Sequence, residues 1–319
     1  MTEVTVRNWT EKWRPKQLKD IILNKQIAQR LNSIIETKNM TNIVLCGKCG
    51  IGKTSIMKCL VYELLGPNAD EGLLEINGSD DRGSTAQKLI EIFDKTYFSN
   101  TDDYVQHKII AIDEMDNIKT KVQQAITLLL DTSNTKFIMT CNESINIIEG
   151  IQSKSIVIHI PPPTDTDILY RLKHICSVEK VQYTDEGLMS LIMLSDGDIR
   201  NAINNLQLVH YGYGLVNKTN VDEICDKPPP MYIADLLVLC DKHKVKEAFK
   251  LIEQLLNKGY SVLDIIQTMF ITIKHYKVNM DEERKILMLR IVSLSFEKLL
   301  TGNMSKIQLY GTIGDLCLL

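Results

Sequence analysis

Residues 43–60 read IVLCGKCGIGKTSIMKCL, which is an apolar run, a glycine-rich loop and the start of a helical segment in direct succession. Residues 47–54 match the phosphate-binding loop pattern G-x-x-x-x-G-K-T, placed after a predicted strand as the pattern requires. The glycines let backbone amides curl around phosphate oxygens, Lys53 brings a positive charge to the β- and γ-phosphates, and Thr54 offers a hydroxyl to Mg²⁺. We therefore predict a site for ATP and Mg²⁺ formed by Gly47, Lys48, Cys49, Gly50, Ile51, Gly52, Lys53, Thr54 and Ser55.

The runs around this loop predict an α/β fold. Five short β-rich runs, at residues 42–46, 73–77, 108–112, 136–140 and 156–160, alternate with segments long enough for crossover helices. That order is typical of a parallel sheet flanked by helices. Proline triplets at residues 161–163 and 228–230 interrupt the chain, and the apolar spacing after the first triplet is helical. We predict a nucleotide-binding domain with a five-stranded parallel sheet at residues 1–163, a helical lid at 164–227 and an all-α domain at 228–319.

Acidic residues follow a second apolar run. Residues 109–112 lead directly into Asp113 and Glu114. ATP hydrolysis needs a carboxylate for the metal and a base for water, and we assign these roles to Asp113 and Glu114, respectively. The run at 136–140 is followed by Asn142, a candidate sensor of the γ-phosphate. Together with Lys53, these residues predict an ATPase.

Composition excludes several classes of protein. The 319 residues carry 37 Lys+Arg and 40 Asp+Glu, a net charge of −3, and are 44% hydrophobic, which is unlike collagen, coiled coils or disordered tails. Residues 1–60 hold 11 basic and 4 acidic residues, a balance of 11 − 4 = +7, so a nucleotide or nucleic-acid partner is compatible. The sequence has no secretion signal or long apolar span, and we expect an intracellular protein with free thiols. The C-x-x-C at Cys46 and Cys49 lacks a second ligand pair at metal-binding spacing.

With these motifs in place, the chain resembles the AAA+ clamp loaders, and most closely the small subunits of replication factor C. The resemblance covers about residues 8–210 at the level of motifs, while the last hundred residues match the family's oligomerising collar in helical character and place. Four stretches carry it: Trp9-Thr10-Glu11-Lys12-Trp13-Arg14-Pro15-Lys16, similar to W-x-E-K-Y-R-P-K; Ser79-Asp80-Asp81-Arg82-Gly83, identical to S-D-D-R-G; Asp113-Glu114-Met115-Asp116, a variant of D-E-A-D; and Gly197-Asp198-Ile199-Arg200-Asn201-Ala202-Ile203-Asn204, similar to G-D-M-R-R-A-L-N.

This resemblance implies roles for residues around the nucleotide. Trp13, Arg14 and Pro15 would lie on the adenine side, with Trp13 in place of the family's tyrosine. Arg200 would project from the lid towards the γ-phosphate and couple ATP binding to the angle of the lid.

One departure concerns the neighbouring subunit's site. Members of the family usually carry S-R-C near the end of the first domain, and the arginine reaches into the neighbour's ATP site in trans. This chain has Ser153-Lys154-Ser155. Lysine keeps the charge but lacks the planar fork of arginine. We expect either that Lys154 is a weakened trans finger or that the neighbouring site need not hydrolyse ATP. The paired arginines that the family often carries near Thr127 and Leu128 are also missing.

The resemblance also implies partners: other subunits in a hetero-pentamer, a sliding clamp of the proliferating cell nuclear antigen type, and primer-template DNA. Basic residues at helix starts would follow the DNA backbone, and the candidates are Arg82, Lys119 and Lys121. A solvated helix face explains the two lysines nearly as well. The segment after Arg82 carries candidate clamp contacts, although an amphipathic helix packed on the sheet explains them equally: Ile90, Phe93, Tyr97 and Phe98.

The function that these observations predict is ATP-driven loading of a ring-shaped clamp onto primed DNA during replication. One alternative is another DNA-associated AAA+ ATPase, such as a helicase loader or recombination ATPase. A second is a clamp-loader subunit that binds ATP as a non-catalytic scaffold. The expected location is a site of DNA replication, in a nucleus or a viral factory.

Overall fold

The computed structural model describes residues 8–79, 90, 92–96, 98–100, 104–132, 134–224, 228–275, 281–302 and 305–319. The chain divides into two compact units, Met1–Val216 and Asn217–Leu319. The predicted boundary between residues 163 and 164 falls in the connection between a strand and a helix of the first unit. The boundary predicted between residues 227 and 228 adjoins residues 225–227, which lie outside the described ranges.

The first unit contains the predicted five-stranded parallel sheet, so the predicted fold class is confirmed. Its strand order is β2-β3-β4-β1-β5, and neighbouring strands pair in parallel throughout. Because all five strands run the same way, the residues after β1, β3 and β4 meet at one edge of the sheet. The strands are β1 (Ile43–Cys46), β2 (Leu73–Asn77), β3 (Ile109–Asp113), β4 (Lys136–Cys141) and β5 (Ile156–His159).

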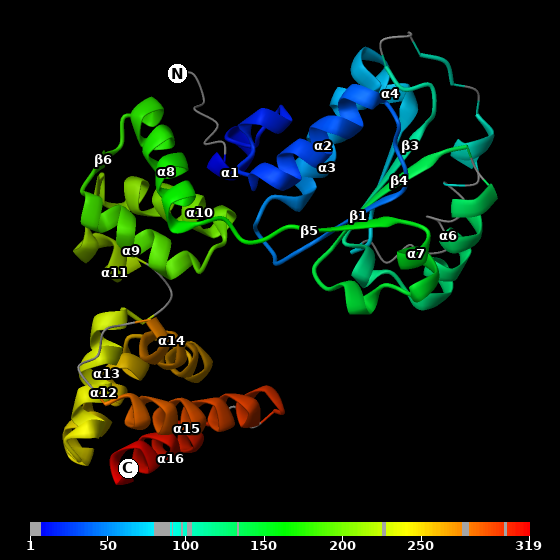
Figure 1. The fold of residues 1–319 in the computed structure, drawn as a ribbon. Helices are drawn as coiled ribbons and strands as arrows, with labels where there is room; N and C mark the ends of the chain where they lie inside the picture. Colours follow the sequence, from blue (N-terminus) through cyan, green and yellow to red (C-terminus); the bar gives the residue numbers. More distant parts are fainter. Residues whose placement is uncertain are drawn as a thin grey trace. The chain divides into compact units, whose positions relative to one another are not determined.

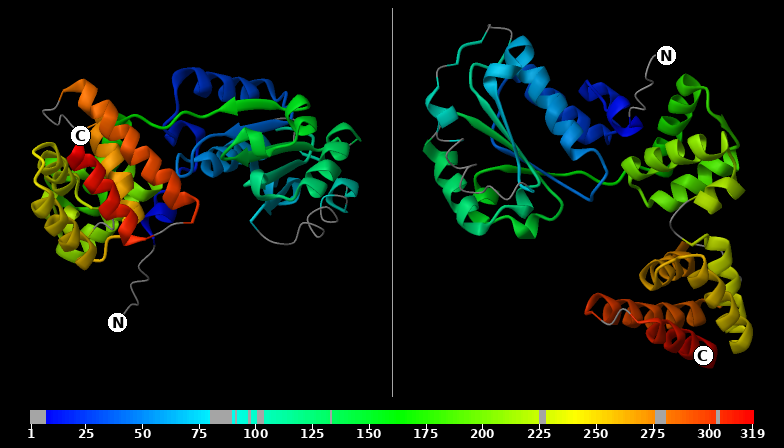
Figure 2. Two further views of the ribbon diagram at one scale, coloured as in Figure 1. Left: turned by 90° about the horizontal axis from the view of Figure 1, so that it is seen from below. Right: turned by 180° about the vertical axis from the view of Figure 1, so that it is seen from behind.

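Helices cover both faces of this sheet (Figures 1 and 2). On one face, α2 (Lys25–Thr37) and α3 (Lys53–Leu65) pack on alternate strand residues such as Leu45 and Ile138. On the other face, α6 (Thr120–Thr132) and α7 (Glu149–Ser153) pack on residues such as Val44 and Ile110. The alternation of side chains along each strand thus explains why the central strands β1, β3 and β4 are apolar on both faces over most of their length. The shorter elements that precede β5 in the first unit are α1 (Trp9–Lys12), η1 (Leu18–Asp20), η2 (Gly66–Asn68), α4 (Ala69–Gly72), η3 (Met115–Asn117) and η4 (Ser144–Asn146).

Three helices and a two-stranded sheet follow β5 in the same unit. Each helix begins at a polar side chain that accepts a backbone N–H of the first turn: Thr164, which forms a capping box with Asp167, then Thr184 and Asp198. These caps fix where the helices start, and Asp198 places Arg200 in the first turn of its helix. The elements are α8 (Asp165–Glu179), α9 (Asp185–Ser195), α10 (Ile199–Tyr213), β6 (Gln182–Tyr183) and β7 (Leu215–Val216).

The second unit is all-α in its described residues, as predicted. Pro230 occupies the first turn of α12, a position that needs no amide hydrogen. Fully buried Leu237, Ile252, Met269 and Val292 contribute to a separate hydrophobic core. None of the helices that the structure describes, in either unit, has the length and apolar character required to cross a membrane. The helices of this unit are α11 (Lys218–Ile224), α12 (Pro230–Asp241), α13 (Val245–Asn257), α14 (Val262–His275), α15 (Glu282–Leu300) and α16 (Lys306–Leu318).

Candidate nucleotide site

The glycine-rich loop joins buried strand β1 to the start of α3 and needs glycine at defined positions. Gly50 and Gly52 have φ angles of +73° and +96°, a region that other residues rarely adopt. A Cβ on Gly47 would lie 2.6 Å from the carbonyl oxygen of Ile160, at the end of the neighbouring strand. A Cβ on Gly50 would lie 1.9 Å from the carboxylate of Asp198. The loop is therefore packed tightly between the sheet and α10, and the free amides at the start of α3 form an anion-binding end.

Lys53 is held inside this loop and is only 9% exposed. Its ammonium donates to the carbonyl oxygens of Gly47 and Lys48, both at 2.7 Å, and to Oδ1 of Asn142 at 2.9 Å. Burial lowers the pKa of Lys53 from its ordinary value, while nearby Cys49, Cys141 and acidic groups oppose that shift. A bound phosphate would favour the charged form in the same way. The structure thus brings together Lys53 and Asn142, which lie far apart in the sequence.

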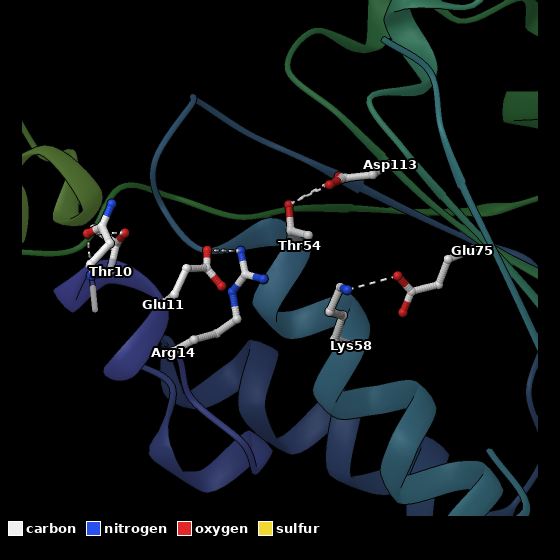
Figure 3. Close-up of polar contacts among 8 residues, drawn as sticks. Thr10, Glu11, Arg14, Thr54, Lys58, Glu75 and Asp113 are labelled. Carbon is white, nitrogen blue, oxygen red and sulfur yellow. Dashed lines mark hydrogen bonds and ion pairs between the residues drawn. The ribbon is translucent and has the colours of Figure 1, made fainter. Parts of the chain in front are cut away.

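Thr54 and Asp113 meet at the same edge of the sheet (Figure 3). The Thr54 hydroxyl donates to the two carboxylate oxygens of Asp113 at 2.9 and 3.1 Å. A hydroxyl and a carboxylate that leave room for phosphate and water oxygens form the donor set that Mg²⁺ prefers. The residues present therefore fit the ion, and Thr54 and Asp113 would hold it.

Glu114 follows Asp113 in an unusual backbone conformation, with φ 53° and ψ 50°. Its carboxylate accepts hydrogen bonds from the Ser79 hydroxyl and from the Asn117 side-chain amide, the latter at 2.9 Å. Its backbone N–H donates to the Thr140 hydroxyl at 3.0 Å. Asp116, in the same turn, accepts the backbone N–H of Asn142 at 3.0 Å. Hydrogen bonds therefore join the acidic turn at residues 113–116 to the end of β4.

Two cavities that share lining residues lie beside the loop. One, with about 350 Å³ of empty space, is lined by Lys53, Thr54, Asp113, Glu114 and Asn142, and is suited to the phosphates. The other, with about 680 Å³, is lined by largely apolar residues from the N-terminal segment and α10, and is suited to a base and sugar. Gly50, Gly52 and the exposed Arg200 line both. Ile51 and Ser55 line the larger cavity, whereas Cys49 lines the smaller one.

The N-terminal segment forms one wall of the larger cavity and is fastened to the helices after β5. Trp13, Arg14 and Pro15, the residues predicted for the adenine side, line the cavity. The Trp13 indole N–H donates to Glu179 at 2.8 Å, and Arg171 donates to the Trp13 carbonyl at 2.6 Å. Arg14 itself pairs with Glu11 at 3.1 Å (Figure 3). The tryptophan that replaces the usual tyrosine therefore has a partner of its own on α8.

Comparisons with known proteins agree with this geometry. Residues 43–161 match the ATPase family associated with various cellular activities (AAA), and residues 228–315 match the replication factor C C-terminal domain. A probable replication factor C subunit 2 from Dictyostelium discoideum is 39% identical, covering 97% of this chain and 92% of that protein. A putative replication factor C small subunit from Acanthamoeba polyphaga mimivirus is 32% identical, covering 96% and 95%. The chain belongs to the replication factor C small-subunit family.

Solved structures share the fold over most of the chain. The Holliday junction branch migration motor RuvB from Thermotoga maritima superposes with a TM-score of 0.55, covering 71% of this chain and 78% of that chain. The two sequences are 15% identical, so this likeness concerns the fold alone.

Lys154, the residue predicted to act as a trans finger, lies directly after α7. Its ammonium donates to the Asp131 carboxylate and, at 3.2 Å, to the Thr127 carbonyl, both on α6. Its charge is therefore engaged within its own chain. Reaching a neighbour's phosphate would require Lys154 to exchange these two partners.

The residues predicted to contact DNA and the clamp differ in exposure, and two of them lie outside the described residues. Lys119 and Lys121 are exposed around the start of α6, whereas Arg82 and Tyr97 lie outside the described residues. Ile90 is 1% exposed and belongs to the core on one face of the sheet, with Phe93 packed against it. Phe98 packs against the core on the other face. Packing on the sheet thus accounts for these three side chains, and Ile90 offers no surface to a clamp in this conformation.

Several site residues were missed by the sequence reasoning. Ser79, Asn117 and Thr140 contact Glu114, and Arg171 and Glu179 contact Trp13. Thr140 ends the run at 136–140 that the sequence predicts as a strand, but its place beside Asp113 follows from the register of β3 and β4. The others depend on contacts between distant segments.

Proposed function

We propose that this chain is an ATP-hydrolysing small subunit of a clamp loader, which acts with other subunits to open a ring-shaped sliding clamp and load it onto primer-template DNA at sites of replication. The observation that carries the proposal is the arrangement of Lys53, Thr54, Asp113, Glu114 and Asn142 around one cavity. Membership of the replication factor C family supports the proposal that the clamp and primer-template DNA are the partners. The proposed division of labour assigns residues 1–163 to ATP chemistry, 164–227 to the lid and 228–319 to oligomerisation.

The reaction is phosphoryl transfer from ATP to water. The loop amides and Lys53 would bind the phosphates, while Mg²⁺ held by Thr54 and Asp113 would neutralise charge on the phosphate oxygens. Glu114 would accept the proton of the attacking water, and Asn142 would orient the γ-phosphate. Arg200 lines both cavities from α10, so its contact with the nucleotide would depend on the lid's position. Binding and hydrolysis would in this way bias two arrangements of the assembly.

Steady-state ATP hydrolysis by the chain assembled with its native partners tests the proposal. Turnover should rise when primed DNA and clamp are added together. If DNA stimulates turnover but clamp has no effect, the chain serves another DNA-associated AAA+ function instead. If stimulation is unchanged when this chain's Glu114 is replaced by glutamine, the chain is a scaffold and its partners hydrolyse ATP.

Lys154→Arg is expected to raise the DNA- and clamp-stimulated turnover of the assembly. Arginine presents a planar fork of donors to phosphate oxygens, whereas the lysine ammonium is a single point charge. The Asp131→Asn variant, which weakens the contact that holds Lys154 on α6, is the matched control for release of the lysine alone. Unchanged turnover in both variants would mean that the neighbouring site uses no finger from this chain.

Replacing both Lys119 and Lys121 with alanine should weaken DNA binding by the assembly equally for all sequences. Contacts to phosphates release counterions, so the slope of log affinity against log salt should become shallower by up to about 0.9 per lost contact. Lys250→Ala, an exposed lysine of the second unit, is the control. An unchanged salt slope would assign the two lysines to a solvated face.

A further inference from the structure

Thr140 lies at the junction between the two acidic residues of the site. It is the second-last residue of β4, and its side chain is 0% exposed. Register pairs Ile112 of β3 with Met139, so the next residues along the two strands, Asp113 and Thr140, lie beside each other. The Thr140 hydroxyl donates to Oδ1 of Asp113 and accepts the backbone N–H of Glu114 at 3.0 Å. One oxygen atom thus contacts the metal-binding carboxylate and the backbone of the proposed base.

The Glu114 backbone needs such support because its φ of 53° is unfavourable for a residue with a side chain. Backbone conformations of this kind persist where several surrounding contacts fix them. Gly78 supplies the contact on the β2 side: its N–H donates to the Asp113 carbonyl at 2.8 Å, and a Cβ there would lie 2.1 Å from the Glu114 carbonyl oxygen. Thr140 supplies the contact on the β4 side. The turn that presents Glu114 is therefore fixed from both neighbouring strands.

The hydrogen bond from Thr140 to Asp113 would gain importance once ATP and Mg²⁺ are bound. Within the described part of the chain, Asp113 receives side-chain hydrogen bonds from Thr54 and Thr140. Thr54 is itself a proposed metal ligand: its hydroxyl oxygen would bind the ion, while its hydrogen could still be donated to Asp113. Thr140 is the donor that orients the Asp113 carboxylate without binding the ion itself. Groups that orient a metal ligand from outside typically contribute 10- to 100-fold to metal affinity or activity.

We propose that Thr140 is a positioning residue for ATP hydrolysis, whose hydroxyl holds the Asp113 carboxylate and the Glu114 backbone in one arrangement. The inference rests on the proposed function of this site and adds a residue to it. The inference also makes a prediction that differs from the one for an ordinary core residue. If Thr140 only filled space, valine, which has nearly the same shape, would leave the Mg²⁺ dependence and kcat unchanged, and the smaller serine would be the harmful substitution. A positioning hydroxyl predicts the reverse order.

The test compares Thr140→Val with Thr140→Ser in the full-length chain, using binding of a fluorescent ATP analogue with EDTA and across a Mg²⁺ titration. Thr140→Val should leave the affinity for the analogue in EDTA unchanged, and should raise about tenfold the Mg²⁺ concentration that gives half of the Mg²⁺-dependent gain in binding. Thr140→Ser should keep this Mg²⁺ concentration within about twofold of that of the unchanged protein. In the assembled complex, valine should lower kcat about tenfold or more with little change in KM. Thr140→Ala should behave like valine and serves as the second variant, with binding in EDTA as the check of folding.

Equal Mg²⁺ dependence in the valine, alanine and unchanged proteins would overturn the inference. Lys53→Ala separates that result from failure of the proposed function. If Lys53→Ala abolishes analogue binding while valine has no effect, the site stands and only the role of Thr140 is wrong. If Lys53→Ala leaves binding intact, the nucleotide site itself is wrongly assigned and the inference falls with it.

Discussion

Replacing Glu114 with glutamine should lower the ATP turnover of this subunit by about a hundredfold or more, which is the usual contribution of a general base. Glutamine preserves the shape of the side chain and can still accept a hydrogen bond from Ser79 or Asn117, but it cannot take a proton from water. ATP binding should therefore remain. Single-turnover hydrolysis by the assembly, with the other subunits' sites inactivated, measures this effect directly.

Glu143→Gln is the matched control for this prediction. Glu143 is an exposed glutamate directly after Asn142, so the substitution removes the same charge close to the site without touching the Asp113–Glu114 turn. We expect turnover close to that of the unchanged protein. A similar loss in both variants would show that charge near the phosphates matters, and not proton transfer to Glu114.

The chemistry at the sheet edge was predictable because its residues occur in local patterns. The loop at residues 47–54, the acidic pair after β3 and Asn142 after β4 each follow an apolar run, and parallel strands bring such ends together. The five strands were likewise predictable to within about one residue, because buried parallel strands are continuous apolar runs.

The supporting contacts were not predictable because they join segments through register and packing. The partnership of Thr140 with Glu114 requires the alignment of β3 and β4, which the sequence does not state. The bond of Trp13 to Glu179 joins residues 166 positions apart. The candidate clamp residues show the opposite difficulty: the spacing of Ile90 and Phe93 fits both a clamp-binding segment and a helix packed on the sheet, and it is the structure that places Ile90 in the core.

Gly50→Ala is expected to be a strongly disruptive single-methyl change in the site. Alanine at φ +73° carries a backbone penalty of about 1–2 kcal/mol, and its Cβ would overlap the Asp198 carboxylate at 1.9 Å. Asp198 accepts the Asn201 N–H at 2.9 Å and so caps α10, the helix that carries Arg200. Displacing it adds the loss of a cap, about 0.5–2 kcal/mol. Thermal unfolding and binding of an ATP analogue measure the two consequences.

Gly52→Ala provides the control, because Gly52 has a φ of +96° but nothing lies within 4 Å of an added Cβ. It should show the backbone penalty without the collision, and hence a smaller loss of stability. A double-mutant cycle with Asp198→Ala isolates the collision itself: once the carboxylate is gone, Gly50→Ala should cost no more than Gly52→Ala. Strictly additive losses would mean that the loop and α10 do not press on each other. Less-than-additive losses would place the phosphate loop in direct mechanical contact with the helix that carries Arg200, so that a nucleotide filling the loop would act on the lid through Asp198 as well as through the arginine.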